Sequence, residues 1–197
     1  MGLFVSPFIL IYIEKFGIIL VISEVLNMNE KVRLVLDNGK SLDIELYPDV
    51  APISVSNFLK LVDKKYYDGI IFHRIIRDFM VQAGGYKIED NSLVEAEDVE
   101  TIKGEFKSNG VKNDLKHTLG VLSMARTNVK DSASSQFFIC TADAPHLDGQ
   151  YAAFGKVIGE ESYKVLEELN QARTEFVSNM FADFPYPFIT IKTITRI

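Results

Sequence analysis

Short stretches of alternating polar and apolar residues dominate this 197-residue chain, and only two segments show the spacing of an amphipathic helix. The helical segments run from Pro52 to about Lys65 and onward from Gly159. The first alternating stretches, Lys31 to Leu36 and Ser41 to Leu46, flank Asn38-Gly39, a pair typical of a tight β-hairpin. Two helices are too few to connect the strands of a parallel sheet, so we expect a mainly β protein with antiparallel strands. A closed barrel leaves no exposed strand edges, and we expect the two helices to cap its open ends.

Later segments rich in β-branched and aromatic residues predict further strands. These are Ile70 to Ile76, Gly120 to Met124, Gln136 to Thr141, Tyr151 to Val157 and Phe188 to Ile197. Residues 86–116 are acidic and poorly periodic, which predicts a long connection with a solvated acidic surface. Connections of this length in a compact domain are usually functional or locally folded.

The composition argues against several classes of protein and site. A net charge of −6 gives no support for nucleic-acid binding. The single cysteine, Cys140, cannot form an internal disulfide, and its apolar neighbours suggest a buried side chain in a reducing compartment. The three histidines, His73, His117 and His146, lack the spacing of zinc ligands, so we expect no metal site.

The N-terminal stretch Leu3 to Leu26 is mostly apolar, but a proline and the charged pair Glu14-Lys15 interrupt it. A membrane-spanning helix needs about 20 apolar residues, and a central charged pair is costly in a bilayer. A signal peptide requires a basic segment before the apolar run and a small-residue cleavage site after it, and neither is present. Residues 1–27 therefore keep three interpretations: a membrane anchor, an export signal, or a start codon assigned too early, with Met28 as the true first residue. We expect one domain over residues 28–197 in a cytoplasmic protein, with anchoring or export through the N-terminal stretch as the alternative.

An arginine, Arg74, interrupts the apolar strand expected from Ile70 to Ile76. Side chains alternate along a strand, which puts Arg74 on the same face as Phe72 and Ile76. A guanidinium on an apolar face is costly unless its donors find partners. For an isolated arginine of this kind, the usual explanation is a long side chain whose charged end reaches solvent. The alternative is a functional cation beside an apolar pocket.

Common enzyme motifs are missing from the sequence. It contains no G-x-S-x-G nucleophile motif, no phosphate-binding glycine motif and no distinct pair of carboxylates. If the protein is an enzyme, we therefore expect it to need no nucleophile, metal or cofactor.

Four blocks of sequence resemble the cyclophilin-type peptidyl-prolyl cis-trans isomerases and occur in the order found in that family. They are Phe72 to Gly85, Ser123 to Arg126, Ser135 to Thr141 and Leu147 to Gly155, within a similarity from about Lys31 to Ile197. The resemblance is to bacterial-type, single-domain members and implies a closed eight-stranded antiparallel barrel capped by two α-helices. It also implies an isomerase that accelerates rotation about X-Pro bonds by non-covalent stabilisation of the twisted transition state.

By this resemblance, Arg74 is the catalytic residue. The resemblance further implies a set of substrate-binding residues, with an apolar group around the proline ring and polar groups along the peptide backbone. These residues are Phe79, Met80, Gln82, Ala125, Arg126, Gln136, Phe138, His146, Leu147 and Tyr151. Strand periodicity agrees, because Gln136 and Phe138 share one face and so do Met80 and Gln82.

Several positions depart from the family pattern. His146 stands where many members have a tryptophan associated with tight cyclosporin binding, so we expect only weak cyclosporin binding. Tyr151 replaces a pocket histidine, Arg126 replaces a common asparagine, and the acidic stretch Glu89 to Glu100 replaces a glycine-rich connection. Sequence preference beyond the proline therefore stays open.

The expected partners are proline-containing peptides and unfolded or partly folded protein clients. We expect a monomer that assists folding in the manner of a chaperone, without cofactor or nucleic acid. The alternative hypothesis is a non-catalytic module that binds or scaffolds proline peptides, suggested by His146, Arg126 and the acidic stretch. The complete set of Arg74 and apolar pocket residues favours the isomerase.

Overall fold

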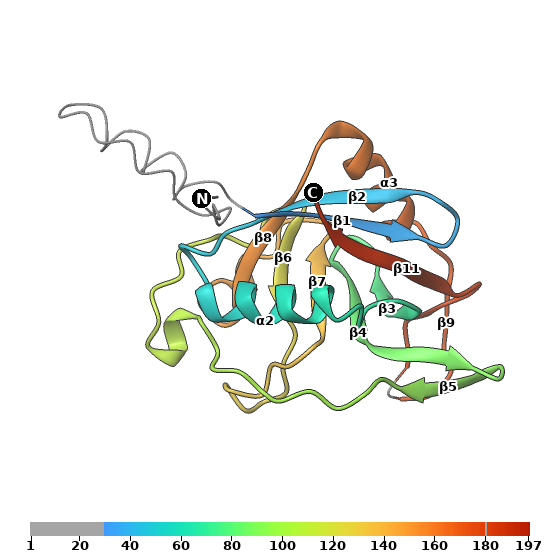
Figure 1. The fold of residues 1–197 in the computed structure, drawn as a ribbon, viewed down its shortest axis with the longest axis horizontal. Coiled ribbons are helices and arrows are strands. Elements are labelled where there is room, and N and C mark those ends of the chain that lie inside the picture. The colour runs from blue at the N-terminus through green and yellow to red at the C-terminus, as the bar shows by residue number, and fades with distance from the viewer. Residues whose placement is uncertain (1–29, 180) are drawn as a thin grey trace, which may run out of the picture.

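The computed structural model describes residues 30–179 and 181–197, so the N-terminal extension suggested for residues 1–27 lies outside the described residues. Within the described part, no helix combines the length and apolarity needed to cross a membrane. In the described residues, the fold is a β-barrel accompanied by two α-helices, α2 (Pro52–Asp63) and α3 (Glu160–Asn170) (Figure 1). Both helices that the sequence predicts are therefore present.

Eight antiparallel strands form a closed ring, because β4 pairs with β7 on one side and with β3 on the other. In spatial order the ring consists of β3 (Ile70–Ile76), β11 (Ile189–Arg196), β1 (Lys31–Leu36), β2 (Ser41–Leu46), β8 (Ala153–Ile158), β6 (Val121–Met124), β7 (Phe137–Cys140) and β4 (Met80–Glu89). This arrangement confirms the predicted eight-stranded antiparallel barrel with two helices.

The first hairpin shows how the alternating sequence forms the inside of the barrel. Val32 and Leu34 of β1 are fully buried, whereas Lys31 and Arg33 are exposed. In the pairing of β1 with β2, Leu34 lies opposite the buried Leu42, so apolar side chains meet on the inner face. Burial of these side chains fixes the register of the hairpin, because a slip of one residue would expose them.

Aromatic side chains fill the barrel. The ring centre of Phe58, from α2, lies 5.2 Å from that of Tyr67, 5.5 Å from Phe137 and 5.4 Å from Phe154. All four side chains are fully buried. Because side chains occupy the interior at the density of a protein core, a peptide can bind only at the outer surface.

A residue from a distant loop caps the amino end of α2. Ala51 occupies the N-cap position and offers no side-chain hydrogen bond. The buried carboxylate of Glu105 instead accepts hydrogen bonds from the backbone N–H groups of Ile53 (2.9 Å) and Ser54 (2.7 Å), and from the Ser54 hydroxyl (2.7 Å). A carboxylate at this end of a helix also interacts favourably with the helix dipole. Glu105 thereby ties the long connection after β4 to α2.

The first part of that connection forms regular structure. β4 continues to Glu89 and pairs with β5 (Ser92–Glu95) in a hairpin that extends beyond the ring (Figure 1). Asp90 and Asn91 form the turn with φ values of 48° and 60°. The long connection that the sequence predicts over residues 86–116 is therefore locally folded at residues 86–95, because Asp-Asn adopts the turn that Asn-Gly or Asp-Gly usually forms. The remainder is irregular apart from the short 3-10 helix η1 (Lys107–Asn109).

A small two-stranded sheet between α3 and β11 is absent from the sequence prediction. It consists of β9 (Thr174–Glu175) and β10 (Phe184–Pro185). The described residues from 172 to 188 around these strands are called the β9–β10 segment below. The backbone N–H of Ile75 donates to the carbonyl of Asp183 at 2.9 Å, which fixes this segment beside β3.

Candidate active site

Strand β3 presents Arg74 at the outer surface of the barrel. The pairing of β3 with β4 shifts register on both sides of Phe72, which breaks the strict alternation of side chains. Phe72 therefore lies in the barrel core, whereas the Arg74 side chain is 46% exposed. The prediction that Arg74 shares a face with Phe72 is wrong for this reason. Ile76 does belong to the outer side, where it packs against a second apolar cluster.

This second cluster lies apart from the main core and forms the floor of a pocket. Its buried members come from β4, from β7 and from the loop that contains the 3-10 helix η2 (Pro145–Leu147). They are Met80, Phe138, Cys140, Ala144 and Leu147. The pocket above them has a volume of about 200 Å³ and is lined by Arg74, Phe79, Met80, Gln82, Ala125, Arg126, Phe138, Leu147 and Tyr151.

Most of the residues singled out in the sequence thus meet in one pocket, and two lie beside it. Gln136 is outside the lining, but its Oε1 accepts a hydrogen bond of 2.9 Å from Nε2 of Gln82. His146 lies against the Phe79 ring, with 5.3 Å between ring centres. The structure therefore brings an apolar surface, two amide side chains and two arginines together.

The two arginines of the pocket differ in their surroundings. The guanidinium of Arg126 lies 4.5 Å from the ring centre of Tyr151 and donates to the carbonyls of Gln150 (2.9 Å) and Thr127 (2.8 Å). Within the described part of the chain, the guanidinium of Arg74 makes no hydrogen bond. Its Nε lies 3.8 Å from Oδ2 of Asp183, which is too long for a hydrogen bond. The donors of Arg74 are therefore available to a ligand.

Consecutive glycines allow β4 to approach the start of β7 closely. A Cβ atom on Gly84 would lie 2.4 Å from the carbonyl oxygen of Ser135, and one on Gly85 would lie 2.5 Å from Nε2 of Gln136. Gly84 also has a φ of 103°, which other residues rarely adopt. The glycines thus bring Gln136 within hydrogen-bonding distance of Gln82.

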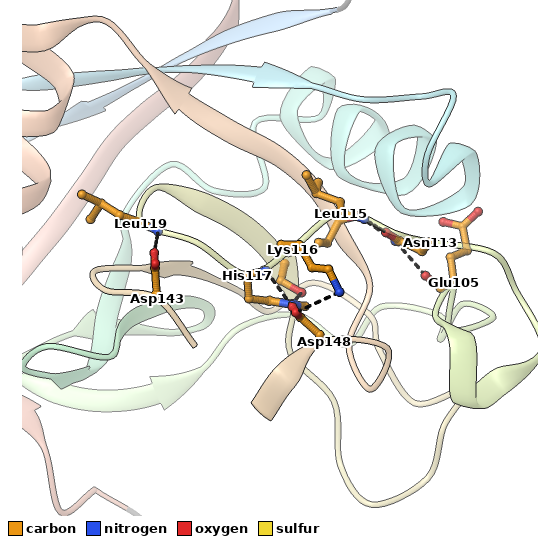
Figure 2. A network of polar contacts seen from close by, with 10 residues as sticks. Glu105, Asn113, Leu115, Lys116, His117, Leu119, Asp143 and Asp148 are labelled. Atoms are coloured by element: carbon orange, nitrogen blue, oxygen red, sulfur yellow. Dashed lines mark hydrogen bonds and ion pairs between the residues drawn. The ribbon is translucent and has the colours of Figure 1, made fainter. Parts of the chain in front are cut away.

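A buried histidine supports the pocket floor from below. Nδ1 of His117 lies 3.1 Å from Oδ1 of Asp148, and Nε2 lies 3.1 Å from Oγ of Ser123. Figure 2 shows His117 and Asp148 turned toward each other, with Lys116 completing an ion pair to the same carboxylate. The imidazole stacks on the Phe138 ring with 6.1 Å between ring centres. This network therefore holds one wall of the pocket in place.

The same network contains the groups of an acyl-transfer triad, but its nucleophile is inaccessible. Ser123 has 0% exposure, so no substrate can reach its hydroxyl. Burial lowers the pKa of His117 despite the hydrogen bond with Asp148. Burial acts to raise the pKa of Asp148, but hydrogen bonds from His117 and Lys116 hold it below its ordinary value. The arrangement is a neutral histidine bonded to a carboxylate, with a structural role.

Sequence reasoning missed several residues around the pocket. The partners of His117 are 31 and 6 residues away, with no motif that connects them. Asp183 and Phe181 come from the β9–β10 segment, which contains no recognisable pattern. Only the folded barrel brings these residues close to the pocket, so no local pattern in the sequence identifies them.

Comparisons with known proteins agree on one family. The family model described as cyclophilin type peptidyl-prolyl cis-trans isomerase/CLD matches residues 31–196. A peptidyl-prolyl cis-trans isomerase of Acinetobacter baylyi is 46% identical over 126 residues, covering 61% of this chain and 63% of the relative. Peptidyl-prolyl cis-trans isomerase A of Dickeya dadantii is 37% identical over 166 residues, covering 82% of this chain and 79% of the relative.

A solved structure extends the comparison to the fold. It is a cyclophilin type peptidyl-prolyl cis-trans isomerase of Cryptosporidium parvum, determined in the presence of the dipeptide Ala-Pro. The TM-score is 0.67 at 28% sequence identity, and the match covers 84% of this chain and 97% of the other.

Proposed function

The chain belongs to the cyclophilin-type peptidyl-prolyl cis-trans isomerases, and we propose that the pocket beside Arg74 is where it accelerates rotation about X-Pro bonds. One observation carries the assignment of the site. A half-exposed guanidinium without hydrogen bonds stands at the edge of an apolar pocket of about 200 Å³. This combination suits a substrate that is apolar at its ring and polar at the adjacent amide.

The reaction requires no covalent step. The barrier to amide rotation, about 18–20 kcal/mol, comes from resonance between the nitrogen and the carbonyl. Resonance is lost when the bond is twisted by 90°, and the prolyl nitrogen then regains a lone pair. A donor that reaches the nitrogen only in this state stabilises the transition state without stabilising the substrate. A barrier lowered by about 7 kcal/mol corresponds to roughly 10⁵-fold acceleration.

Arg74 is suited to this role. Arginine stays charged at all physiological pH values and presents its donors in a rigid planar fork. A bound peptide would cover the half-exposed guanidinium together with its apolar neighbours, and the removal of water would strengthen its electrostatic effect on the twisted amide. In this proposal Arg74 donates to the substrate at the prolyl amide.

The other lining residues bind and orient the peptide. We assign the proline ring to the surface formed by Phe79, Met80, Phe138 and Leu147, since these apolar side chains form the pocket floor and wall. Gln82 and Gln136 hold each other in place and present amide groups beside Arg74. Residues 125–126 would lie along the extended peptide. The Ala-Pro dipeptide named for the Cryptosporidium relative supports a proline-containing ligand.

A protease-coupled assay on an X-Pro peptide tests the assignment. Arg74→Ala should lose most of the acceleration, and Arg77→Ala provides a matched control, because Arg77 is exposed on the following turn and outside the pocket lining. Equal activity in wild type and Arg74→Ala would overturn the assignment of the site.

We also propose that the protein acts as a monomer on unfolded or partly folded clients in the cytoplasm, with the anchored or exported form as the alternative. Support for unfolded or partly folded clients comes from the pocket, whose apolar lining suits a proline ring. Cyclosporin should bind weakly, because an imidazole at His146 replaces a larger indole against Phe79. Substitution His146→Trp should strengthen cyclosporin binding, and unchanged binding would contradict this explanation.

A non-catalytic peptide-binding module is the second candidate. The observation in its favour is Arg126, whose guanidinium lies over Tyr151 at the pocket and could restrict how a substrate is seated. Peptide binding without any acceleration of exchange would identify this function instead.

A further inference from the structure

A second pocket lies directly beside the proposed proline site. Its volume is about 330 Å³, and it shares Arg74 and Gln82 with the proline pocket. The remaining lining residues come from β3, β4, the start of β7 and the β9–β10 segment: His73, Tyr86, Gln136, Asn179, Phe181, Ala182 and Asp183. A peptide whose proline occupies the first pocket therefore has a neighbouring residue within reach of the second.

The lining of the second pocket combines aromatic walls with a carboxylate. The rings of Tyr86 and Phe181 meet edge to face, with 5.0 Å between their centres. The Asp183 side chain is 38% exposed, and its ion pair with Arg74 is long, at 3.8 Å. Aromatic walls suit the apolar stem of a long side chain, and they attract a cation at its end. The carboxylate adds a charged acceptor for that cation.

The charges near the pocket also favour a cation. Glu95 of β5 lies opposite Tyr86 in the β4–β5 hairpin. Burial is the main cause of the raised pKa of Tyr86, and the charge of Glu95 is the second. His73 adds no positive charge at neutral pH, because burial, with help from Arg74, lowers its pKa to about 4. Among the lining residues, the charge of Asp183 offsets that of Arg74, so the nearby carboxylate of Glu95 gives the surroundings of the pocket a negative charge.

We propose that the second pocket binds a lysine or arginine side chain of the substrate close to the isomerised proline, with Asp183 as its charge partner. This proposal rests on the assignment of the first pocket as the proline site. A glutamate in the same position would meet Asp183 and Glu95 and be disfavoured, whereas an apolar side chain would gain only the aromatic contacts.

The expected preference is modest, because the pocket is open to solvent. A half-exposed ion pair changes binding by about two- to fivefold. Lysine should therefore raise kcat/KM by about this factor over norleucine, which has a similar stem without the charge. The factor should shrink at 1 M salt, where exposed charges are screened.

Exchange rates of two peptide series test the proposal. One series carries lysine, norleucine or glutamate directly after the proline, and the other carries them two residues before it. Asp183→Asn removes the charge but keeps the hydrogen bond from Ile75, because that bond uses the Asp183 backbone carbonyl. Asp49→Asn makes the same change at an exposed residue outside both pockets.

The wild type and Asp49→Asn should both prefer lysine to norleucine in one of the two series, and Asp183→Asn should lose that preference. A lysine-to-norleucine ratio near one in both series of the wild type would overturn the proposal. So would a ratio that Asp183→Asn leaves unchanged. Failure of the proline site itself would look different, because the norleucine peptides would then exchange no faster with enzyme than without it.

Discussion

Glu105 should contribute more to the stability of this protein than other surface-loop carboxylates, because it caps α2 from a distance. Its buried carboxylate accepts three hydrogen bonds, two of them from backbone N–H groups of the first helical turn. Substitution Glu105→Ala would leave these donors without partners in a buried environment. An unsatisfied buried donor costs about 1–3 kcal/mol, and the loss of a helix cap costs about 0.5–2 kcal/mol. Because water can enter the space of the removed side chain, we expect a total loss of about 2–4 kcal/mol.

Urea unfolding followed by circular dichroism measures this loss directly. In thermal unfolding of a chain of this size, a loss of about 3 kcal/mol corresponds to a decrease in Tm of roughly 6–12 °C. Glu105→Gln keeps an acceptor oxygen and should lose less than Glu105→Ala. Glu100→Ala is the matched control, since Glu100 is exposed in the same connection. A Glu105→Ala variant as stable as Glu100→Ala would refute the argument that the helix depends on this remote cap.

Two further predictions concern stability. The lowered pKa of His73, about 4, lies below the value of about 6.5 in an unfolded chain, so between these pH values only the unfolded chain binds the proton. Stability should therefore fall by up to about 3 kcal/mol as the pH decreases from 6.5 to 4, and His73→Phe should flatten this dependence in urea titrations. A His73→Phe variant that keeps the full pH dependence would count against His73 as the cause. Gly84→Ala should cost more than about 2 kcal/mol, because its Cβ would clash with the Ser135 carbonyl as well as adopt a strained φ. Gly39 also has a positive φ, but no atom would lie within 4 Å of its Cβ, so Gly39→Ala should cost only about 1 kcal/mol of stability. Equal losses of stability in the two variants would show that the close approach of Gly84 to Ser135 is unimportant.

Local patterns in the sequence predict much of this fold. The alternation in β1 and β2, with Asn38-Gly39 between them, indicates both strands and their inner face. The spacing of apolar residues after Pro52 indicates α2. These features depend on residues close together in the chain, and their physical causes are local: turn geometry, side-chain alternation and helical periodicity.

Features that depend on long-range pairing were not predictable in the same way. The face of Arg74 depends on a register shift between β3 and β4, which no residue of β3 alone reveals. Asp183 lies 109 positions after Arg74 and reaches it only because the backbone of the β9–β10 segment bonds to Ile75. The resemblance to a known family led to most pocket residues, whereas this segment lies outside the motifs that carry the resemblance.

We propose that Arg74 stabilises the twisted amide and contributes much less to binding of the substrate. Two-dimensional exchange NMR on a proline peptide tests it most directly, because one set of titrations yields both the cis-trans exchange rate and the peptide affinity. We expect Arg74→Ala to lower the exchange rate at saturating peptide by at least 100-fold, about 2.7 kcal/mol, with a much smaller change in affinity. An Arg74→Ala variant that loses affinity but exchanges bound peptide as fast as wild type would contradict it.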